Sequence, residues 1–270
     1  MADRLQSGRA RLALAAGAAV IVLVVGVVAL REPPGPPGAG ERVVLYGDSL
    51  SVEAGGAFTA AMERDAEAEV VVKAIPGIAP CDAYPNMQAD MADPATRPTV
   101  AVVQFTGNNA SDCIRDADGA ELAGPALAQR YAGDMRAVVE LLATQGVRVV
   151  LVSPIPAPGL PGEAEALIAD EYLRIVTEWA GRDIGQVRYA PAVDKVTGPD
   201  EAYVDTLPCL PSEGADQGCT NGEITVRSVD RIHFCPVDTE DDMSCPAYSS
   251  GATRFGDEMA RVATQALSDY

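Results

Sequence analysis

A short apolar run ends on Gly47-Asp48-Ser49, and small or polar residues follow it as far as Gly56. Two interpretations fit such an end. Asp48 or Ser49 can cap the N-terminus of a following helix, or Ser49 can be a nucleophile at the carboxyl edge of a sheet. A serine nucleophile needs a base that takes its proton and donors that stabilise an oxyanion. The rest of the chain must supply both.

The only histidine of the chain, His233, is the candidate base, and Asp230 stands three residues before it. Histidine is the usual general base near neutral pH, and a carboxylate can orient and support its charged form. A lone histidine is more often structural than catalytic, and Asp-x-x-His is a weak signal by itself. Its weight comes from its occurrence together with Ser49 and two further unusual strand ends.

Those strand ends supply candidate oxyanion donors. One apolar run ends on Gly77 after Pro76, and another ends on Gly107-Asn108-Asn109. The carboxyl ends of parallel strands share one edge of a sheet. The N–H of Gly77 and the side chain of Asn109 would therefore approach Ser49. Ordinary turn chemistry explains Pro-Gly equally well, and Asn108 competes with Asn109 for the role.

The elements that must position these residues alternate along the chain. Val/Ile/Leu-rich runs predict strands, and apolar residues at helical spacing predict helices between them. This alternation predicts a parallel sheet covered by helices, which is a three-layer α/β/α sandwich with its ligand site outside the carboxyl ends of the strands. The predicted strands are 43–46, 70–74, 99–105, 147–152 and 187–189, and the predicted helices are 58–68, 125–145, 163–180 and 249–267.

The N-terminal part differs from the rest. An uncharged, proline-free segment at 12–30 follows three arginines, and a Pro/Gly-rich segment follows it. Such a run predicts a membrane span with a cytoplasmic N-terminus, although a cleaved signal peptide and secretion are the alternative. We expect a single-pass protein of the cell membrane. Its parts would be a cytoplasmic segment 1–11, a transmembrane signal anchor 12–30, an extended linker 31–40 and an extracytoplasmic domain 41–270.

Six cysteines agree with an oxidising compartment. They can pair in many ways, and the sequence does not choose among them. From proximity we expect Cys209 with Cys219 and Cys235 with Cys245, which leaves Cys81 with Cys113. The acidic stretch 197–228, which has little periodicity, is then an ordered loop stapled by a disulfide. Zinc is disfavoured, because there is no Cys-x-x-Cys and only one histidine.

The charge balance excludes one class of partner. The chain has 39 acidic and 20 basic residues, a net charge of −19, and no basic cluster beyond the N-terminal arginines. Nucleic-acid binding requires a basic surface and is not expected. The acidity indicates a solvated surface. The chain is rich in Ala, Gly and Val and uses only two lysines, which suggests a GC-rich genome such as that of an actinobacterium.

Together these residues resemble the SGNH, or GDSL, hydrolase family over most of the outer domain, from Val43 to Leu267. The resemblance is carried by four features in order: Gly47-Asp48-Ser49-Leu50-Ser51, Gly77, Gly107-x-Asn109 and Asp230-x-x-His233. The family's flavodoxin-like sandwich agrees with the predicted elements. The Gly-x-Ser-x-Gly elbow of the α/β-hydrolases is absent around Ser49.

The resemblance implies a role for each residue. Ser49 is the nucleophile, His233 the general base and Asp230 the group that orients it. The amides of Ser49 and Gly77 and the side chain of Asn109 form the oxyanion hole. Asp48 has a structural role. Ala110 departs from the family's usual Asp at this position.

The resemblance also implies a function: a serine esterase that cleaves carboxylic esters through an acyl-enzyme, without a metal or cofactor. Its substrate would be an ester, such as an acylated envelope glycan or a lipid. An acyltransferase with the same residues is one alternative, and a retired hydrolase fold that only binds a ligand is another. A Cys81–Cys113 disulfide would tie the two oxyanion loops together.

Overall fold

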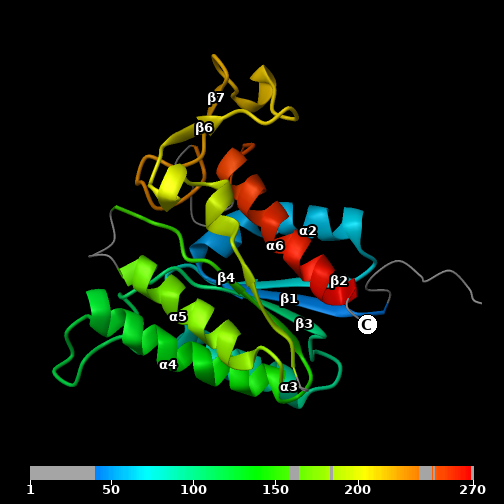
Figure 1. The fold of residues 1–270 in the computed structure, drawn as a ribbon, viewed down its shortest axis with the longest axis vertical. Helices are drawn as coiled ribbons and strands as arrows, with labels where there is room; N and C mark the ends of the chain where they lie inside the picture. Colours follow the sequence, from blue (N-terminus) through cyan, green and yellow to red (C-terminus); the bar gives the residue numbers. More distant parts are fainter. Residues whose placement is uncertain (1–39, 159–163, 183–184, 237–244, 246, 269–270) are drawn as a thin grey trace, which may run out of the picture. The chain divides into compact units, whose positions relative to one another are not determined.

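Five parallel strands form the central sheet, in the order β2-β1-β3-β4-β5 (Figure 1). Strands β1, β3 and β4 are buried on both faces, as expected for continuous Val/Ile/Leu runs. All neighbouring strands pair in parallel register. The strands are β1 (Arg42–Gly47), β2 (Glu69–Ala74), β3 (Val100–Gln104), β4 (Arg148–Val152) and β5 (Val187–Ala190).

Helices cover both faces of the sheet (Figure 1). The buried apolar side chains form two cores. Helices α2 (Ser49–Asp65) and α6 (Ser250–Ser268) lie on one face. The opposite face carries α3 (Pro80–Ala92), α4 (Gly124–Ala143) and α5 (Ala164–Trp179). The predicted three-layer sandwich with a parallel sheet is confirmed.

This computed structural model describes residues 40–158, 164–182, 185–236, 245 and 247–268. The predicted cytoplasmic segment and membrane span, and residues 31–39 of the predicted linker, lie outside these residues. Among the residues that the structure describes, no helix is both long enough and apolar enough to cross a membrane.

Two helices differ from the sequence prediction. Helix α2 begins at Ser49 rather than at residue 58, because Asp48 caps it. The pair Gly55-Gly56, which has low helix propensity, hid this first half. Helix α3 was not predicted at all, because Pro85 lies inside it and proline normally interrupts a helix.

The segment after β5 is ordered and stapled, as predicted. It forms the 3₁₀ turns η1 (Ala192–Lys195), η2 (Pro199–Glu201) and η3 (Ala215–Gln217) and an antiparallel pair, β6 (Thr206–Pro208) with β7 (Glu223–Thr225). The expected disulfide pairing is confirmed at all six cysteines: Cys81–Cys113, Cys209–Cys219 and Cys235–Cys245.

Candidate active site

Ser49 lies where strand β1 passes directly into helix α2. Asp48 caps the helix by accepting a hydrogen bond from the Leu50 N–H at 3.0 Å, which confirms Asp48 as the N-cap. Gly47 is required by close packing. A Cβ at this position would lie 2.1 Å from Ser51 Oγ and 2.8 Å from the Gln104 carbonyl oxygen.

The structure brings Ser49, His233 and Asp230 together. His233 Nε2 lies 2.9 Å from Ser49 Oγ, and His233 Nδ1 lies 2.6 Å from Asp230 Oδ2. A carboxylate beside Nδ1 favours the tautomer that carries its proton there, which leaves Nε2 as an acceptor facing the serine hydroxyl. Ser49 is 7% exposed and the His233 side chain is 21% exposed, so the serine is buried and the imidazole is partly accessible to solvent.

Asp230 is held in its charged form. Its Oδ1 accepts hydrogen bonds from the Ile232 N–H at 2.9 Å, from the His233 N–H at 3.0 Å and from the Ser228 hydroxyl. Partial burial works against the carboxylate, but the bonds from Ser228 and His233 outweigh burial and hold the pKa of Asp230 well below its usual value. Asp230 is therefore an anion at any pH near neutral.

Asp48 joins the ends of β1 and β3. Its Oδ2 accepts bonds from the Thr106 N–H at 2.8 Å and from Asn108 Nδ2 at 3.3 Å. Burial raises the pKa of Asp48 to about 6, although the bonds from Thr106, Leu50 and Gln104 oppose the rise. The side chain thus serves to position the loops around Ser49.

The loop that carries Gly77 is anchored on both sides. The Ile75 N–H donates to the Gly47 carbonyl at 3.0 Å, and Asn108 Nδ2 donates to the Ile78 carbonyl at 3.1 Å. Gly77 itself is exposed, with a φ of +75° that favours glycine. Asn109 Nδ2 donates to the Leu122 carbonyl at 3.2 Å. Its side chain is thus directed by the loop that follows it.

Glu53 is a buried residue near the site that the sequence analysis missed. Its Oε2 accepts a hydrogen bond from the Phe234 N–H, next to His233, at 2.6 Å. Burial raises the pKa of Glu53 to about 7, although the bond from Phe234 and the nearby His233 oppose the rise. Its spacing from Ser49, four residues or one helical turn, was the available signal. The late predicted start of the helix concealed it.

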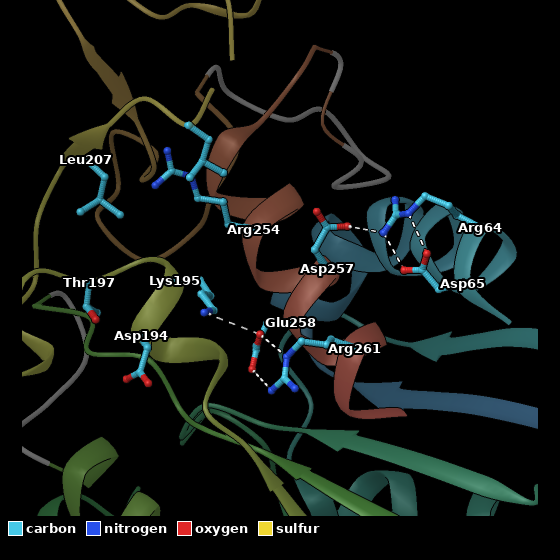
Figure 2. A pocket seen from close by; sticks show the side chains of 11 residues that line it. Arg64, Asp65, Asp194, Lys195, Thr197, Leu207, Arg254, Asp257, Glu258 and Arg261 are labelled. Carbon is cyan, nitrogen blue, oxygen red and sulfur yellow. Dashed lines mark hydrogen bonds and ion pairs between the residues drawn. The ribbon is translucent and has the colours of Figure 1, made fainter. Parts of the chain in front are cut away.

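A cavity of about 580 Å³ lies apart from this site, beside α2, η1, β6 and α6 (Figure 2). Neither Ser49 nor His233 nor Asp230 lines it. Its charged lining is balanced, with four cationic and four anionic side chains, several of which pair within the cavity. They are Arg64, Lys195, Arg254, Arg261, Asp65, Asp194, Asp257 and Glu258.

Two groups among the described residues have the residue types of a metal site: Glu53 with Cys235 and Cys245, and Asp82 with Cys81 and Cys113. In both, the two sulfur atoms are bonded to each other as a disulfide. A metal thiolate site needs deprotonated cysteine sulfur. These donor sets therefore do not suit a metal ion.

Comparisons with known proteins agree with the fold. The model of the family described as "Protein of unknown function (DUF459)" matches residues 42–238. A search of curated proteins finds no match. Among solved structures, the lipase/acylhydrolase from Enterococcus faecalis is 14% identical with a TM-score of 0.53, covering 83% of this chain and 96% of that one.

Two further structures are similar to the chain. A putative lipolytic protein of the G-D-S-L family from Desulfitobacterium hafniense DCB-2 is 14% identical with a TM-score of 0.50, covering 84% of this chain and 99% of its own. A putative acylhydrolase from Bacteroides fragilis NCTC 9343 is 16% identical with a TM-score of 0.51, and the match covers 87% of this chain and 92% of that one. At these identities the likeness shows a shared fold.

Proposed function

We propose that this chain, which belongs to the family described as Protein of unknown function (DUF459), hydrolyses carboxylic esters through an acyl-enzyme on Ser49. One observation carries the proposal. The hydroxyl of Ser49, both ring nitrogens of His233 and the carboxylate of Asp230 form a continuous hydrogen-bonded chain. These hydrogen-bonded side chains lie at the edge of the central sheet, in a fold that resembles that of the solved acylhydrolases.

The reaction follows from this geometry. Ser49 Oγ attacks the ester carbonyl carbon while its proton passes to Nε2 of His233, and Asp230 stabilises the imidazolium that results. The tetrahedral intermediate collapses, and the alcohol leaves with the proton from His233. A water molecule then attacks the acyl-enzyme with His233 again as the base. The carboxylic acid leaves and Ser49 recovers its proton.

The oxyanion formed at each step needs donors beside Ser49. The backbone N–H of Ser49 lies at the positive end of helix α2, where the first N–H groups have no acceptor within the helix. The Gly77 N–H and Asn109 side chain complete our proposed set. Asn109 is favoured over Asn108 because Asn108 Nδ2 already donates to Asp48 and to Ile78, whereas among the described residues Asn109 Nδ2 donates only to Leu122.

We further propose that the catalytic domain lies outside the cell membrane, anchored by residues 12–30. Three disulfides in the described domain support an oxidising compartment. An acylated envelope glycan or a lipid ester in that compartment is the substrate class that we infer. The site needs no cofactor for this chemistry.

The experiment compares the full-length protein with Ser49→Ala, both produced in an oxidising compartment, on p-nitrophenyl acetate, butyrate and octanoate. We expect turnover that Ser49→Ala abolishes, together with labelling of Ser49 by a fluorophosphonate. The preference among the three esters would define the acyl group. Labelling without hydrolysis would indicate an acyltransferase that awaits its acceptor alcohol. A folded wild type with neither turnover nor labelling would refute catalysis and favour a binding module.

A further inference from the structure

Phe234, the residue after His233, is anchored at three points. Its N–H donates to Glu53 Oε2 at 2.6 Å, and its carbonyl accepts from Ser249 Oγ at 2.8 Å. Its ring packs against Phe255 with centroids 5.1 Å apart. Through Glu53, the backbone beside His233 is therefore bonded directly to helix α2.

Two hydrogen bonds consequently link the same two segments. Ser49 and Glu53 lie one turn apart on α2, and His233 and Phe234 are neighbours in the chain. The Ser49–His233 bond of 2.9 Å and the Glu53–Phe234 bond of 2.6 Å run between these pairs. The second bond therefore limits how far the imidazole can move from the serine hydroxyl.

Glu53 is placed at a cost to stability. It is 6% exposed, and its carboxylate lies within 4.8 Å of both sulfur atoms of the Cys235–Cys245 disulfide. Its Oε1 is buried without a hydrogen-bond partner in the described part of the chain. A buried carboxylate with so few partners destabilises a fold. Its contribution is thus expected elsewhere than in stability.

The charged groups near Glu53 agree with a role at His233. His233 and Asp230 affect its ionisation from the loop above α2. The guanidinium of Arg227 is buried 5.2 Å from the ring centroid of Phe234. Burial lowers the pKa of Arg227, and the negative charge of Glu53 opposes that fall. Since His233 opposes the rise in the pKa of Glu53, the ionised carboxylate and the imidazolium stabilise each other.

We propose that Glu53 is a positioning residue that holds the His233 loop against the nucleophile's helix and, in its ionised form, supports the imidazolium formed during the reaction. The inference rests on the proposed ester hydrolysis. Glu53 acts through the Phe234 N–H and through its charge, and it does not contact the ester.

The first test is kinetic and uses the full-length chain with Glu53→Gln, Glu53→Ala and the control Glu258→Gln. Glu258 is equally buried but pairs with Arg261 and Lys195, away from the loop. We expect Glu53→Gln, which keeps an acceptor but loses the charge, to lower kcat about tenfold. Glu53→Ala should lower kcat about 10²-fold through misplacement of the imidazole. KM should stay within about twofold in both, and Glu258→Gln should match the wild type.

The second test does not depend on turnover. The chain has four phenylalanines, so ¹⁵N-phenylalanine labelling gives four amide signals, and Phe234→Leu identifies the one of interest. We expect the Phe234 amide shift to change with an inflection near pH 7 in the wild type and to lose it in Glu53→Gln. The kcat profile of the wild type should contain the same ionisation, and that of Glu53→Gln should lack it.

The outcomes separate the two proposals. If the wild type is active and Glu53→Ala has the same kcat, the role of Glu53 is overturned and ester hydrolysis stands. The same holds if the wild type is active and the Phe234 amide shift shows no inflection near pH 7. Wild type without turnover or fluorophosphonate labelling would overturn ester hydrolysis, and with it the catalytic use of Glu53. The amide titration would still decide whether Glu53 holds the loop.

Discussion

Replacing Glu53 by glutamine should stabilise the folded protein above neutral pH. Burial raises the pKa of Glu53 from an ordinary 4.5 to about 7, so the folded protein holds this proton more tightly than the unfolded chain does. Below pH 4.5 the carboxyl is protonated in both states. As the pH rises to 7 the unfolded chain loses the proton first, and the free energy of unfolding falls. Above 7 the full cost persists.

The size of the effect follows from the two pKa values. The difference between 4.5 and about 7, at about 1.4 kcal/mol for each pH unit, is about 3 kcal/mol. The carboxylate is 6% exposed, so solvent screens this cost little. Glutamine keeps an acceptor for the Phe234 N–H and carries no charge. The free energy of unfolding of Glu53→Gln, relative to that of the wild type, should therefore rise by about 3 kcal/mol between pH 4.5 and pH 8.

Urea unfolding of the oxidised full-length protein at both pH values measures this gain. Glu258→Gln is the matched control, because it leaves Arg261 and Lys195 without their carboxylate and should gain nothing. A stability difference between Glu53→Gln and wild type that is the same at pH 4.5 and pH 8 would refute the reasoning. Combined with the kinetic test, the expected result is a variant that is more stable and less active.

Two further predictions concern the frame around Ser49. Gly47→Ala should cost about 2–3 kcal/mol in urea unfolding and most of the ester turnover, because its Cβ would overlap Ser51 and Gln104. Gly56→Ala, where a Cβ meets nothing within 4 Å, should instead gain about 0.5–1 kcal/mol, and equal stability of the two variants would contradict this assignment. Serine at both positions of the Cys81–Cys113 bridge, whose cysteines are 32 residues apart, should cost about 3–4 kcal/mol and lower kcat. The same change in the Cys209–Cys219 bridge should leave kcat unchanged, and a loss of kcat in both would argue against a specific effect on the oxyanion loops.

The layers of this fold could be predicted because their signals are local. Continuous Val/Ile/Leu runs are typical of strands buried on both faces, and β1, β3 and β4 have that burial. Helices α4 and α5 follow the spacing of their apolar residues. The prediction failed where local preference and tertiary packing disagree. Gly55-Gly56 lies within α2, and Pro85 lies within α3, because packing against the sheet outweighs low helix propensity.

The sequence by itself determined which residue types are present and that Ser49, Gly77 and Asn109 follow three strands of one predicted parallel sheet. The carboxyl ends of such strands share one edge, so a site at this edge could be expected without coordinates. The order of the strands, with β2 and β3 on either side of β1, came from the tertiary structure. Only the tertiary structure decided that His233, 184 residues from Ser49, faces its hydroxyl at 2.9 Å. It also decided that Glu53 supports the backbone beside that histidine. Contacts at such separations depend on how the elements pack, and no local pattern records that packing.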